Sequence, residues 1–513
     1  MDYKKIPKSF FLQNPLEQLS SGFKYSFQKK NDKLYFASSI FDSEFSCIQN
    51  YPEISQMINT IHKEIDKNQE KAYIFPYLKT INNYIETPPA PSPDELSEIF
   101  LPTLLDIVNN IIDQSSRNLA LKIIVFLTLG NIPTNSAFLN PKSIHIIASH
   151  LSKRIFFSSN DGFTIDNIIL SSVILINLFS IPALKSKFFS IFQEIELISH
   201  INKTLNNIKS EQEAKYIFRL LLDLIKYTKM MNHQTNEPIY ENHQSNAERE
   251  NFDNFMIFDI LGPNLLLLVS SSGYSQKGSL KCIYYLLHNK TLMDKFLQNG
   301  LPDLLFQNFY NFKYASPIFK CITKICSSNN RIIDPFNNID FNKLIKIISS
   351  TNYKGVRDIL SFISTEMEVC EQTNDQINYQ LNSQLNNQLS KPLNIDFNLL
   401  FNTLLNLFDT RDFKTKLECA KYFGSILNLN ITFDVNHETK MLLKIMDIVS
   451  HASNDDVLYF LAVINLHFEK NYQITMNIAS ETDFPSVLNE LSQNELPEVS
   501  DIASALLLKY FDS

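Results

Sequence analysis

The feature that most constrains this chain is a group of apolar helix patterns that occurs more than once along it. The segment that starts at Asn118 reads NLALKIIVFLTLGNIPTNSAFLNPKSIHIIASHL, and the segment that starts at Ser279 reads SLKCIYYLLHNKTLMDKFLQNGLPDLL. Each has a long apolar helix pattern, a polar turn, a short helix pattern, a break at Pro141 or Gly300, and another apolar helix pattern. Because the same lengths recur, the sequence predicts repeated groups of helices.

Similar long helices are expected at regular intervals over most of the chain. Their starts are expected near Ala120, Ser171, Tyr216, Ser279, Ser316, Gly355, Leu417, Val457 and Asp501. Most intervals between these starts fall near the ~40–47-residue period of helical solenoids. Strand-like alternation is almost absent, and the 9 glycines in 513 residues disfavour Gly-rich loops and strand-dense folds. The sequence therefore predicts an all-α fold, a right-handed α-solenoid of about eight or nine repeats.

Two polar segments and an atypical start interrupt this regularity. Residues 1–50 are predicted to form an N-terminal arm, either irregular or a small hairpin, and residues 51–513 the solenoid. Polar insertions rich in Asn and Gln, interpreted as loops, are expected at about 231–253 and 371–394. The arm is basic. It could contact anionic lipid, an acidic partner or the protein's own groove, although most charge runs are solvated faces.

One short motif resembles a known family. The motif is LQNGLPDLL at Leu297 to Leu305, which resembles the turn between the third helix of one repeat and the first helix of the next in armadillo-repeat proteins. The resemblance extends over about residues 70–513, and the related HEAT solenoids stay open because several units show only two recognisable helices. It implies an armadillo/HEAT-like solenoid whose concave surface binds a protein or an extended peptide.

The resemblance also implies where such a peptide would bind. In armadillo proteins an Asn on the third helix hydrogen-bonds the peptide backbone, and three positions here match its Asn-Leu signature. The peptide-groove candidates are therefore Asn177, Asn428 and Asn465, whose amides can both donate and accept. The alternative is that they are ordinary polar helix residues in an Asn-rich chain.

The chain departs from one branch of that family. Armadillo proteins that act in nuclear import place a Trp four residues before each such Asn, where this chain has Val173, Gly424 and Leu461. Because the chain has no Trp, a groove for nuclear localisation signals is not expected. The formal net charge is −8, and no dense local run of Lys and Arg predicts a basic groove or a nucleic-acid partner.

The sequence predicts no catalytic, cofactor or metal site. Spaced glycines occur at Gly273 and Gly278, but Lys277 precedes the second Gly instead of following it as in a P-loop, so the segment is interpreted as an inter-helix turn. The one His/Glu cluster comprises His233, Glu237, Glu241 and His243. It falls in a polar insertion, and we interpret it as a solvent-exposed loop.

The cysteines and the hydropathy suggest a compartment. Six Cys without a CxxC pair are typical of free thiols in a reducing compartment, so we expect a cytoplasmic protein, with the nucleus as the alternative. The stretch from Asn167 to Leu184 carries no charge, but Asn177 and Pro182 interrupt it. We interpret it as a helix buried in a helical array and expect no transmembrane segment.

These patterns together predict a non-catalytic protein-binding scaffold or adaptor. The alternative is a regulatory subunit or exchange factor that acts on a GTPase, kinase or chaperone. The two hypotheses differ in one respect: an adaptor retains its partner without changing the partner's turnover, whereas a regulator changes it.

Overall fold

The computed structural model describes residues 48–67, 73–87, 89–111, 113–130, 132–152, 167–194, 197–234, 259–329, 339–365, 397–428 and 435–511. The chain divides into two compact units, residues 1–223 and 224–513, and each is described by itself. The N-terminal arm expected over residues 1–50 lies outside the described residues, except for a 3₁₀ turn at Ile48–Asn50. The two expected polar insertions also lie mostly outside them.

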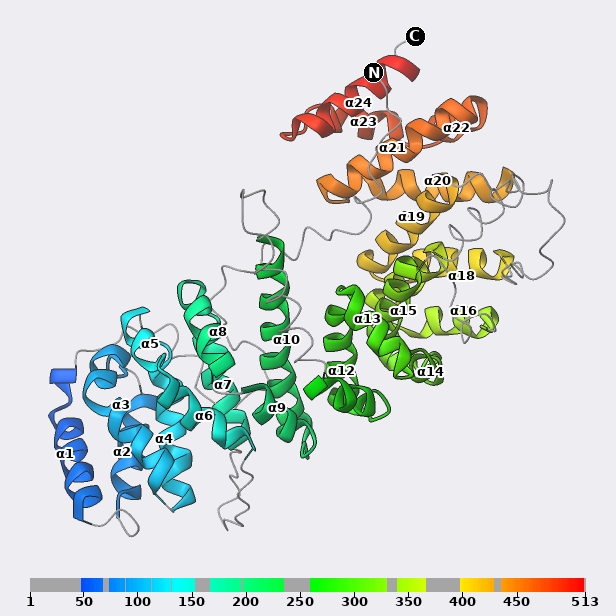
Figure 1. The fold of residues 1–513 in the computed structure, drawn as a ribbon. Helices are drawn as coiled ribbons and strands as arrows, with labels where there is room; N and C mark the ends of the chain where they lie inside the picture. The colour runs from blue at the N-terminus through cyan, green and yellow to red at the C-terminus, as the bar shows by residue number, and fades with distance from the viewer. Residues whose placement is uncertain are drawn as a thin grey trace, which may run out of the picture. The chain divides into compact units, whose positions relative to one another are not determined.

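The first unit is a row of antiparallel helices that follow one another in chain order (Figure 1). Its helices are α1 (Pro52–Lys67), α2 (Phe75–Glu86), α3 (Pro93–Asn110), α4 (Gln114–Leu127), α5 (Ile132–Phe138), α6 (Pro141–Ser152), α7 (Asn167–Phe179), the 3₁₀ helix η6 (Pro182–Leu184), α8 (Lys185–Glu194), α9 (Leu197–Leu205) and the first part of α10 (Glu211–Gln234). The long helices α4 and α7 pack directly against each other, as do α6 and α9. Equivalent helices of successive groups therefore stack.

The second unit continues the same pattern of stacked helices. After the rest of α10 and a helix at Asp259–Val269, it contains α12 (Gly273–Leu286), α13 (Lys290–Gln298), α14 (Leu301–Gln307), the 3₁₀ helix η7 (Phe312–Tyr314), α15 (Ala315–Asn329), α16 (Phe341–Ser350), an unlabelled helix at 353–365, α18 (Phe397–Thr410), α19 (Phe413–Asn428), α20 (Val435–Val449), α21 (Asn454–Lys470), α22 (Tyr472–Ser480), α23 (Phe484–Leu491) and α24 (Pro497–Tyr510). Direct packing joins α12 with α15, α19 with α21, and α21 with α24.

The fold is an all-α solenoid, as the sequence predicts. Each of the nine expected long helices is present and begins between one and six residues before its expected start. Groups of three helices, such as α13–α14–α15 and α22–α23–α24, occur beside groups of two, such as α18–α19 and α20–α21. This mixture explains why the sequence resembles both armadillo and HEAT repeats.

Local chemistry accounts for many of the helix starts. Asp113 caps α4 by accepting hydrogen bonds from the backbone N–H groups of Ser115 and Ser116, and Asp340 caps α16 in the same way. Gly300 has φ 82°, a left-handed conformation that glycine adopts without strain, and it ends α13 and starts α14. The LQNGLPDLL motif therefore joins the first and second helices of a group. Its expected position between a third and a first helix is wrong.

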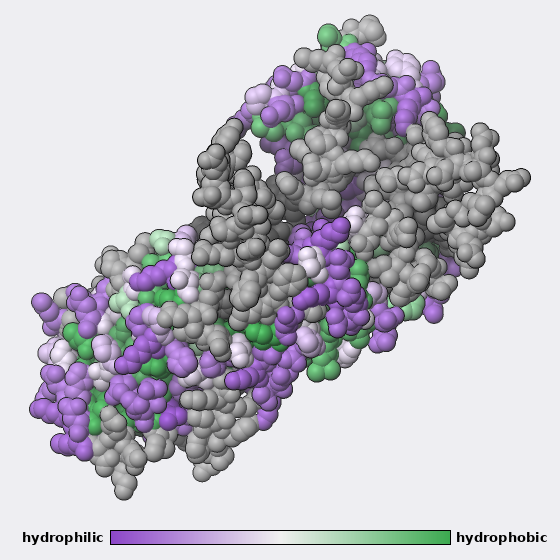
Figure 2. Space-filling model, viewed as in Figure 1, coloured by the Kyte–Doolittle hydropathy of each residue, from purple (hydrophilic) through white to green (hydrophobic). Residues whose placement is uncertain are grey.

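The core runs continuously beneath the helices of each unit and consists of aliphatic and phenylalanine side chains. In the second unit, Phe309, Phe319 and Phe362 form one aromatic cluster with ring centroids 4.8 to 6.1 Å apart, and all three are fully buried. Figure 2 shows hydrophilic residues over much of the described surface on one side, with smaller hydrophobic areas between them. Long helices held on such a core present their polar residues from a rigid support.

The uncharged stretch that begins at Asn167 is a core helix. Eleven of the 13 residues of α7 are buried, and the helix ends at Phe179, before Pro182. No single helix in the described part of the chain is long and apolar enough to cross a membrane, although α7 and the segment Pro182–Ile191 meet that test as a pair bent by 92°. The prediction of a buried helix at this position is confirmed.

Candidate functional site

The predicted candidate Asn177 lies between two stacked long helices. It is half-buried on α7, and its Nδ2 donates a hydrogen bond to Oγ1 of Thr128, which follows α4, over 2.9 Å. The Thr128 hydroxyl in turn donates to the carbonyl oxygen of Val125. The amide of Asn177 therefore joins neighbouring groups of helices within the first unit.

The other two candidates lie on neighbouring long helices of the second unit. Asn465 is half-buried on α21, and its Oδ1 accepts a hydrogen bond from the hydroxyl of Tyr510 on α24 over 3.1 Å. Asn428 is the last residue of α19, and its side chain lies outside the described residues. The packing of α19 against α21 agrees with the 37-residue interval between the two positions.

The positions where import adaptors carry Trp are interior here. Val173 and Leu461 are almost completely buried in the core. Gly424 is also buried, and a Cβ built on it would lie 2.8 Å from the Tyr459 hydroxyl oxygen, which belongs to the next long helix. The Tyr459 hydroxyl donates to the carbonyl oxygen of Lys421 over 3.1 Å. The space next to Gly424 is thus filled by this tyrosine.

The structure brings together a set of lysines that the sequence analysis missed. Lys226 on α10, Lys277 and Lys281 on α12, Lys320 on α15 and Lys354 on the helix at 353–365 lie close enough for the other four to lower the pKa of Lys281. Burial of the Lys281 ammonium among protein atoms is the largest cause of that lowered pKa, and repulsion by the four like charges adds to it. We call these five residues the lysine face.

Three lysines of the face lie beside tyrosine rings. The Lys226 ammonium lies 4.9 Å from the centroid of the Tyr285 ring, and that of Lys320 lies 5.5 Å from the Tyr284 ring. These two contacts link α12 to the long helices on either side of it. Lys354 lies 5.8 Å from the neighbouring Tyr353 ring. Each of these three cations can therefore make a cation–π contact.

None of the five lysines forms an ion pair with any residue that the structure describes. The reason is visible in the sequence, since neither α12 nor α15 contains an Asp or Glu. Both helices instead carry lysines four residues apart, Lys277 with Lys281 and Lys320 with Lys324. Like charges at this spacing destabilise a helix by about 0.2–0.5 kcal/mol per pair. The arrangement is thus unfavourable for the isolated fold.

The sequence analysis did not predict this set of lysines. The density of Lys and Arg along the chain is low, but four helices that span residues 226 to 354 place their lysines on one face. The available sequence signal was the two lysine pairs, each at a spacing of four residues in a helix without acidic residues.

Some charged residues near the lysine face have partners within the fold. Asp358 is 5% exposed, accepts a hydrogen bond from the Ser316 hydroxyl over 2.5 Å, and pairs with Arg357 over 2.9 Å. The Lys421 ammonium lies 2.6 Å from Asp456. Burial raises the pKa of the nearby Glu418, while Lys421 and Arg357 oppose the shift.

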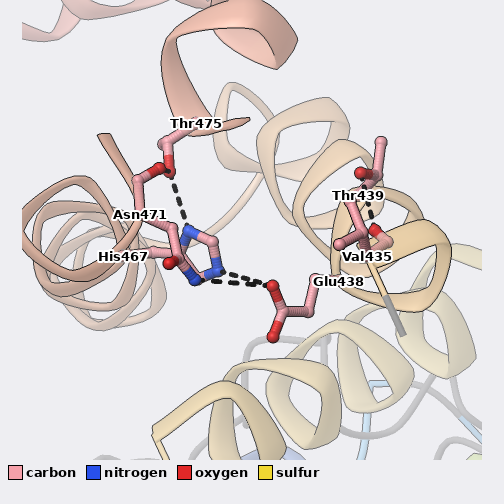
Figure 3. Close-up of polar contacts among 6 residues, drawn as sticks. All are labelled: Val435, Glu438, Thr439, His467, Asn471 and Thr475. Carbon is pink, nitrogen blue, oxygen red and sulfur yellow. Dashed lines mark hydrogen bonds and ion pairs between the residues drawn. The ribbon is translucent and has the colours of Figure 1, made fainter. Parts of the chain in front are cut away.

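A buried polar cluster joins α20, α21 and α22 in the same unit (Figure 3). His467 is 4% exposed, with its Nδ1 2.7 Å from the Thr475 hydroxyl and its Nε2 3.9 Å from Glu438. Asn471 donates to Glu438, and the Thr475 hydroxyl is also close to the Asn471 carbonyl oxygen. Burial lowers the pKa of His467 to about 4, and Lys470 contributes to that shift. The imidazole is therefore neutral at pH 7 and tethers three helices.

The sequence analysis also weighed a glycine-spaced segment, a His/Glu cluster and the cysteines. Gly273 begins α12, so the glycine-spaced segment is the first turn of a helix and not an inter-helix turn. Glu237, Glu241 and His243 lie outside the described residues, and His233 is placed only by its backbone in α10. Within the described ranges no group of His, Cys, Asp or Glu could hold a metal ion.

Cys282 and Cys321 are free and buried, and burial raises the pKa of both thiols.

Comparison with known proteins supports the fold alone. No protein-family model and no curated protein matches the chain. An engineered protein of known structure matches it with a TM-score of 0.52 and 10% identity, over 89% of this chain and 98% of the other. A second engineered protein has a TM-score of 0.37, 13% identity, and coverage of 52% and 96%. A chain from a study of the phosphorylation switch between cadherin and beta-catenin has a TM-score of 0.47, 10% identity, and coverage of 90% and 86%.

Proposed function

We propose that the chain is a non-catalytic scaffold or adaptor that binds partner proteins through the surface shared by its successive long helices, the concave surface of a solenoid. The observation that carries this proposal is the lysine face, where cations from four helices crowd together without ion pairs to the described residues. Such crowding weakens the fold on its own and becomes favourable once an outside group supplies the opposite charge. Helical-repeat architecture supports this role by offering long surfaces for binding.

The chemistry of the described residues favours binding over turnover. The four described cysteines are buried, so a thiolate nucleophile is disfavoured. His467 is enclosed between helices and is held neutral by burial. Solenoid surfaces formed by rigid helices suit the recognition of an extended segment. We therefore propose protein binding without catalysis.

A quantitative capture experiment tests this role. Full-length wild-type protein is crosslinked in its native cells and purified, together with a variant carrying Lys226→Glu, Lys281→Glu and Lys320→Glu. A matched control carries Lys290→Glu, Lys346→Glu and Lys440→Glu, which makes the same charge change at exposed lysines of α13, α16 and α20. Mass spectrometry should show specific proteins retained by the wild type and the control. Capture of no specific protein by the wild type contradicts a scaffold.

The same material separates the adaptor from the regulator. A captured partner that has an enzymatic activity is assayed with and without the purified wild-type chain. An adaptor leaves the partner's turnover unchanged. A change in turnover would contradict simple scaffolding and favour a regulatory subunit or exchange factor.

The asparagine candidates remain a second part of the proposal. The hydrogen bond from Tyr510 uses the Oδ1 atom of Asn465, so the Nδ2 group is the part that would donate to a peptide backbone. Changing Asn428 and Asn465 together to Ala should then weaken partner capture by at least about fivefold without changing helix content. Unchanged capture removes the two asparagines from the site and leaves the scaffold role in place.

A further inference from the structure

We propose that one edge of the second unit binds the surface of an anionic phospholipid membrane. The edge is formed by three successive turns in which an aromatic residue is followed directly by an exposed lysine: Phe312-Lys313, Tyr353-Lys354 and Phe413-Lys414. We call these six residues the aromatic-lysine edge. The inference goes beyond the proposed function, because it concerns the ends of the helices and a lipid surface instead of the long-helix surface and a protein.

Contacts between the turns place the three pairs next to one another. The Thr351 hydroxyl donates a hydrogen bond to the carbonyl oxygen of Phe312 over 3.3 Å, which joins the first turn to the second. The Lys414 ammonium lies 5.3 Å from the centroid of the Tyr353 ring, which joins the third turn to the second. The edge is therefore continuous, although Phe312 and Phe413 are 101 residues apart in the sequence.

The aromatic rings of the edge are open to solvent. Phe312 is 58% exposed and Phe413 is 42% exposed, whereas Tyr353 is half-buried. Phe312 lies in η7, directly before α15, and the other two are the first residues of the helix at 353–365 and of α19. Apolar rings that gather at neighbouring helix starts, outside the core, mark a surface that another molecule covers.

Lysines at these helix starts oppose the helix dipole. The N-terminal end of a helix carries partial positive charge, so acidic residues are favourable there and cations are not. The first turns of α21 and α24 in the same unit follow this rule, with Asp455, Asp456 and Glu498. The first turns of α12, α15 and α19 carry no acidic residue. The dipole and the lysines of the edge thus add to one positive field, which suits an external phosphate.

The local charge of the edge is positive. Its turns carry five cations and one carboxylate, counted over residues 311–316, 351–356 and 411–416. That carboxylate, Asp412, accepts a hydrogen bond from the backbone N–H of Thr415 and caps α19. One of the cations, Arg411, donates to the carbonyl oxygen of Ser349 over 2.6 Å and is held at the edge. The three lysines form no ion pair with any residue that the structure describes.

An anionic membrane surface satisfies both parts of the edge at once. Its headgroups attract lysines, each of which strengthens binding by about fivefold. The apolar layer directly beneath the headgroups accepts aromatic rings, which favour this interfacial depth. A soluble acidic segment would pair with the lysines but would not provide a continuous apolar layer for the rings. The net charge of −8 belongs to the whole chain, and salt screens its distant acidic residues beyond about 8 Å, so the local charge decides at contact.

Flotation of the full-length protein with lipid vesicles tests the inference. The vesicles contain phosphatidylcholine with about 30 mol% phosphatidylserine, and the control vesicles contain phosphatidylcholine alone. Binding to the anionic vesicles should be at least about tenfold tighter than binding to the control vesicles, and it should weaken as salt rises from about 50 to about 300 mM. Absence of flotation with the anionic vesicles at the lower salt concentration would overturn the inference.

A lysine variant locates the charge attraction. Changing Lys313 and Lys414 together to Gln should weaken binding to the anionic vesicles by at least about tenfold, as expected for two lysines near the surface. The matched control changes the exposed Lys290 and Lys346, on α13 and α16, to Gln and should stay within about twofold of the wild type. An equal loss in both proteins would contradict this location.

An aromatic variant tests insertion of the rings. Phe312→Ser with Phe413→Ser should weaken binding by at least about fivefold, because apolar ring area no longer leaves water. Its control is Tyr73→Ser with Leu508→Ser, at two side chains that are 73% and 75% exposed, and it should bind like the wild type. Circular dichroism checks the helix content of each protein. If the aromatic variant does not fold, Lys313→Gln alone should still weaken binding by about threefold or more.

Two further measurements decide between a membrane and other partners. Hydrogen exchange should slow at residues 311–314, 351–354 and 411–414 when anionic vesicles are added, and protection confined to other segments would overturn the inference. A soluble peptide of about twelve Glu residues serves as the protein-like anion. Tighter binding to this peptide than to the vesicles, with the same loss in the lysine variant, would assign the edge to an acidic protein and overturn the membrane assignment.

Discussion

The lysine face and the C-terminal helices α19 to α24 belong to the same unit but hold their charges in opposite ways. In the C-terminal helices, Lys421 pairs with Asp456 over 2.6 Å and Lys509 pairs with Glu469 over 3.0 Å. The partners are 35 and 40 residues apart, about one repeat, so each pair joins one long helix to the next. Across the lysine face, similar intervals separate one lysine from another: Lys281 and Lys320 are 39 residues apart, and Lys320 and Lys354 are 34 residues apart. Ion pairs thus join successive long helices in the C-terminal region, whereas the lysine face has no ion pair with a described residue.

Asp358 lies where the two regions meet, and its removal should have the largest effect. Asp358→Ala deletes a buried carboxylate that holds both Arg357 and the Ser316 hydroxyl, so the Arg357 guanidinium loses its ion-pair partner. Breaking such a pair should lower the free energy of unfolding by about 3 kcal/mol. Urea denaturation followed by circular dichroism measures this change. Asp358→Asn keeps one acceptor and should recover part of the loss, while the exposed Asp501→Ala should stay within about 0.5 kcal/mol of the wild type.

The long helices could be predicted from the sequence because each buries an apolar face that recurs at helical spacing. The core residues Leu280, Ile283 and Leu286 of α12 show that spacing directly. Helix starts were expected up to six residues late, because polar first turns, such as that of α12, lie outside the apolar pattern. Fold class therefore follows from local periodicity.

The candidate site could not be predicted in the same way, because it depends on contacts between helices that are distant in sequence. Lys226 and Lys354 join one face although 128 positions separate them. His467 and Glu438 likewise meet only because α20 packs against α21. A sequence shows which residues carry charge, but the register of the repeats decides whether they meet a partner or a like charge.

The buried cluster around His467 should make the C-terminal helices sensitive to acid. The pKa of His467 is about 4 in the folded protein and near 6.5 when unfolded, so between these two values the unfolded chain binds the proton more readily than the folded chain. Stability is therefore retained above pH 6.5 and is lost as the pH falls toward 4, by about 1.4 kcal/mol for each pH unit well inside this window. Burial raises the pKa of Glu438, so its protonation in the folded state opposes part of this loss.

Unfolding experiments at pH 7.5, 6 and 5 measure the effect of His467. The variant His467→Gln keeps an amide that can hydrogen-bond Thr475 but does not titrate, so its stability should vary less over this range than that of the wild type. Hydrogen exchange should place the acid-induced opening in α20, α21 and α22. The same pH dependence in both proteins would contradict a role for the imidazole.

The ion pair between Lys421 and Asp456, which connects two long helices, should contribute less to the free energy of unfolding than the buried groups of Asp358 and His467. Asp456→Asn leaves Lys421 without its partner on the next long helix, and the two side chains are 17% and 36% exposed. A loss of about 0.5–1 kcal/mol in the free energy of unfolding is expected, and it should shrink in 1 M NaCl because salt screens partly exposed charges. A loss that is unchanged by salt would indicate that hydrogen bonding or packing, and not charge pairing, connects these repeats.

The smallest expected effect has the opposite sign and tests the comparison most directly. Lys320→Gln removes one cation from the lysine face, so it should relieve repulsion with Lys281 and with Lys324 one turn away on α15. We expect the free energy of unfolding to rise by about 0.2–0.5 kcal/mol at low salt, with the gain disappearing at high salt. Thermal unfolding at 20 mM and 500 mM NaCl measures both. Lys421→Gln in the paired region should destabilise instead, because Asp456 then loses its partner. If both substitutions destabilise the protein alike, the lysine face is satisfied within the fold and is not available for binding.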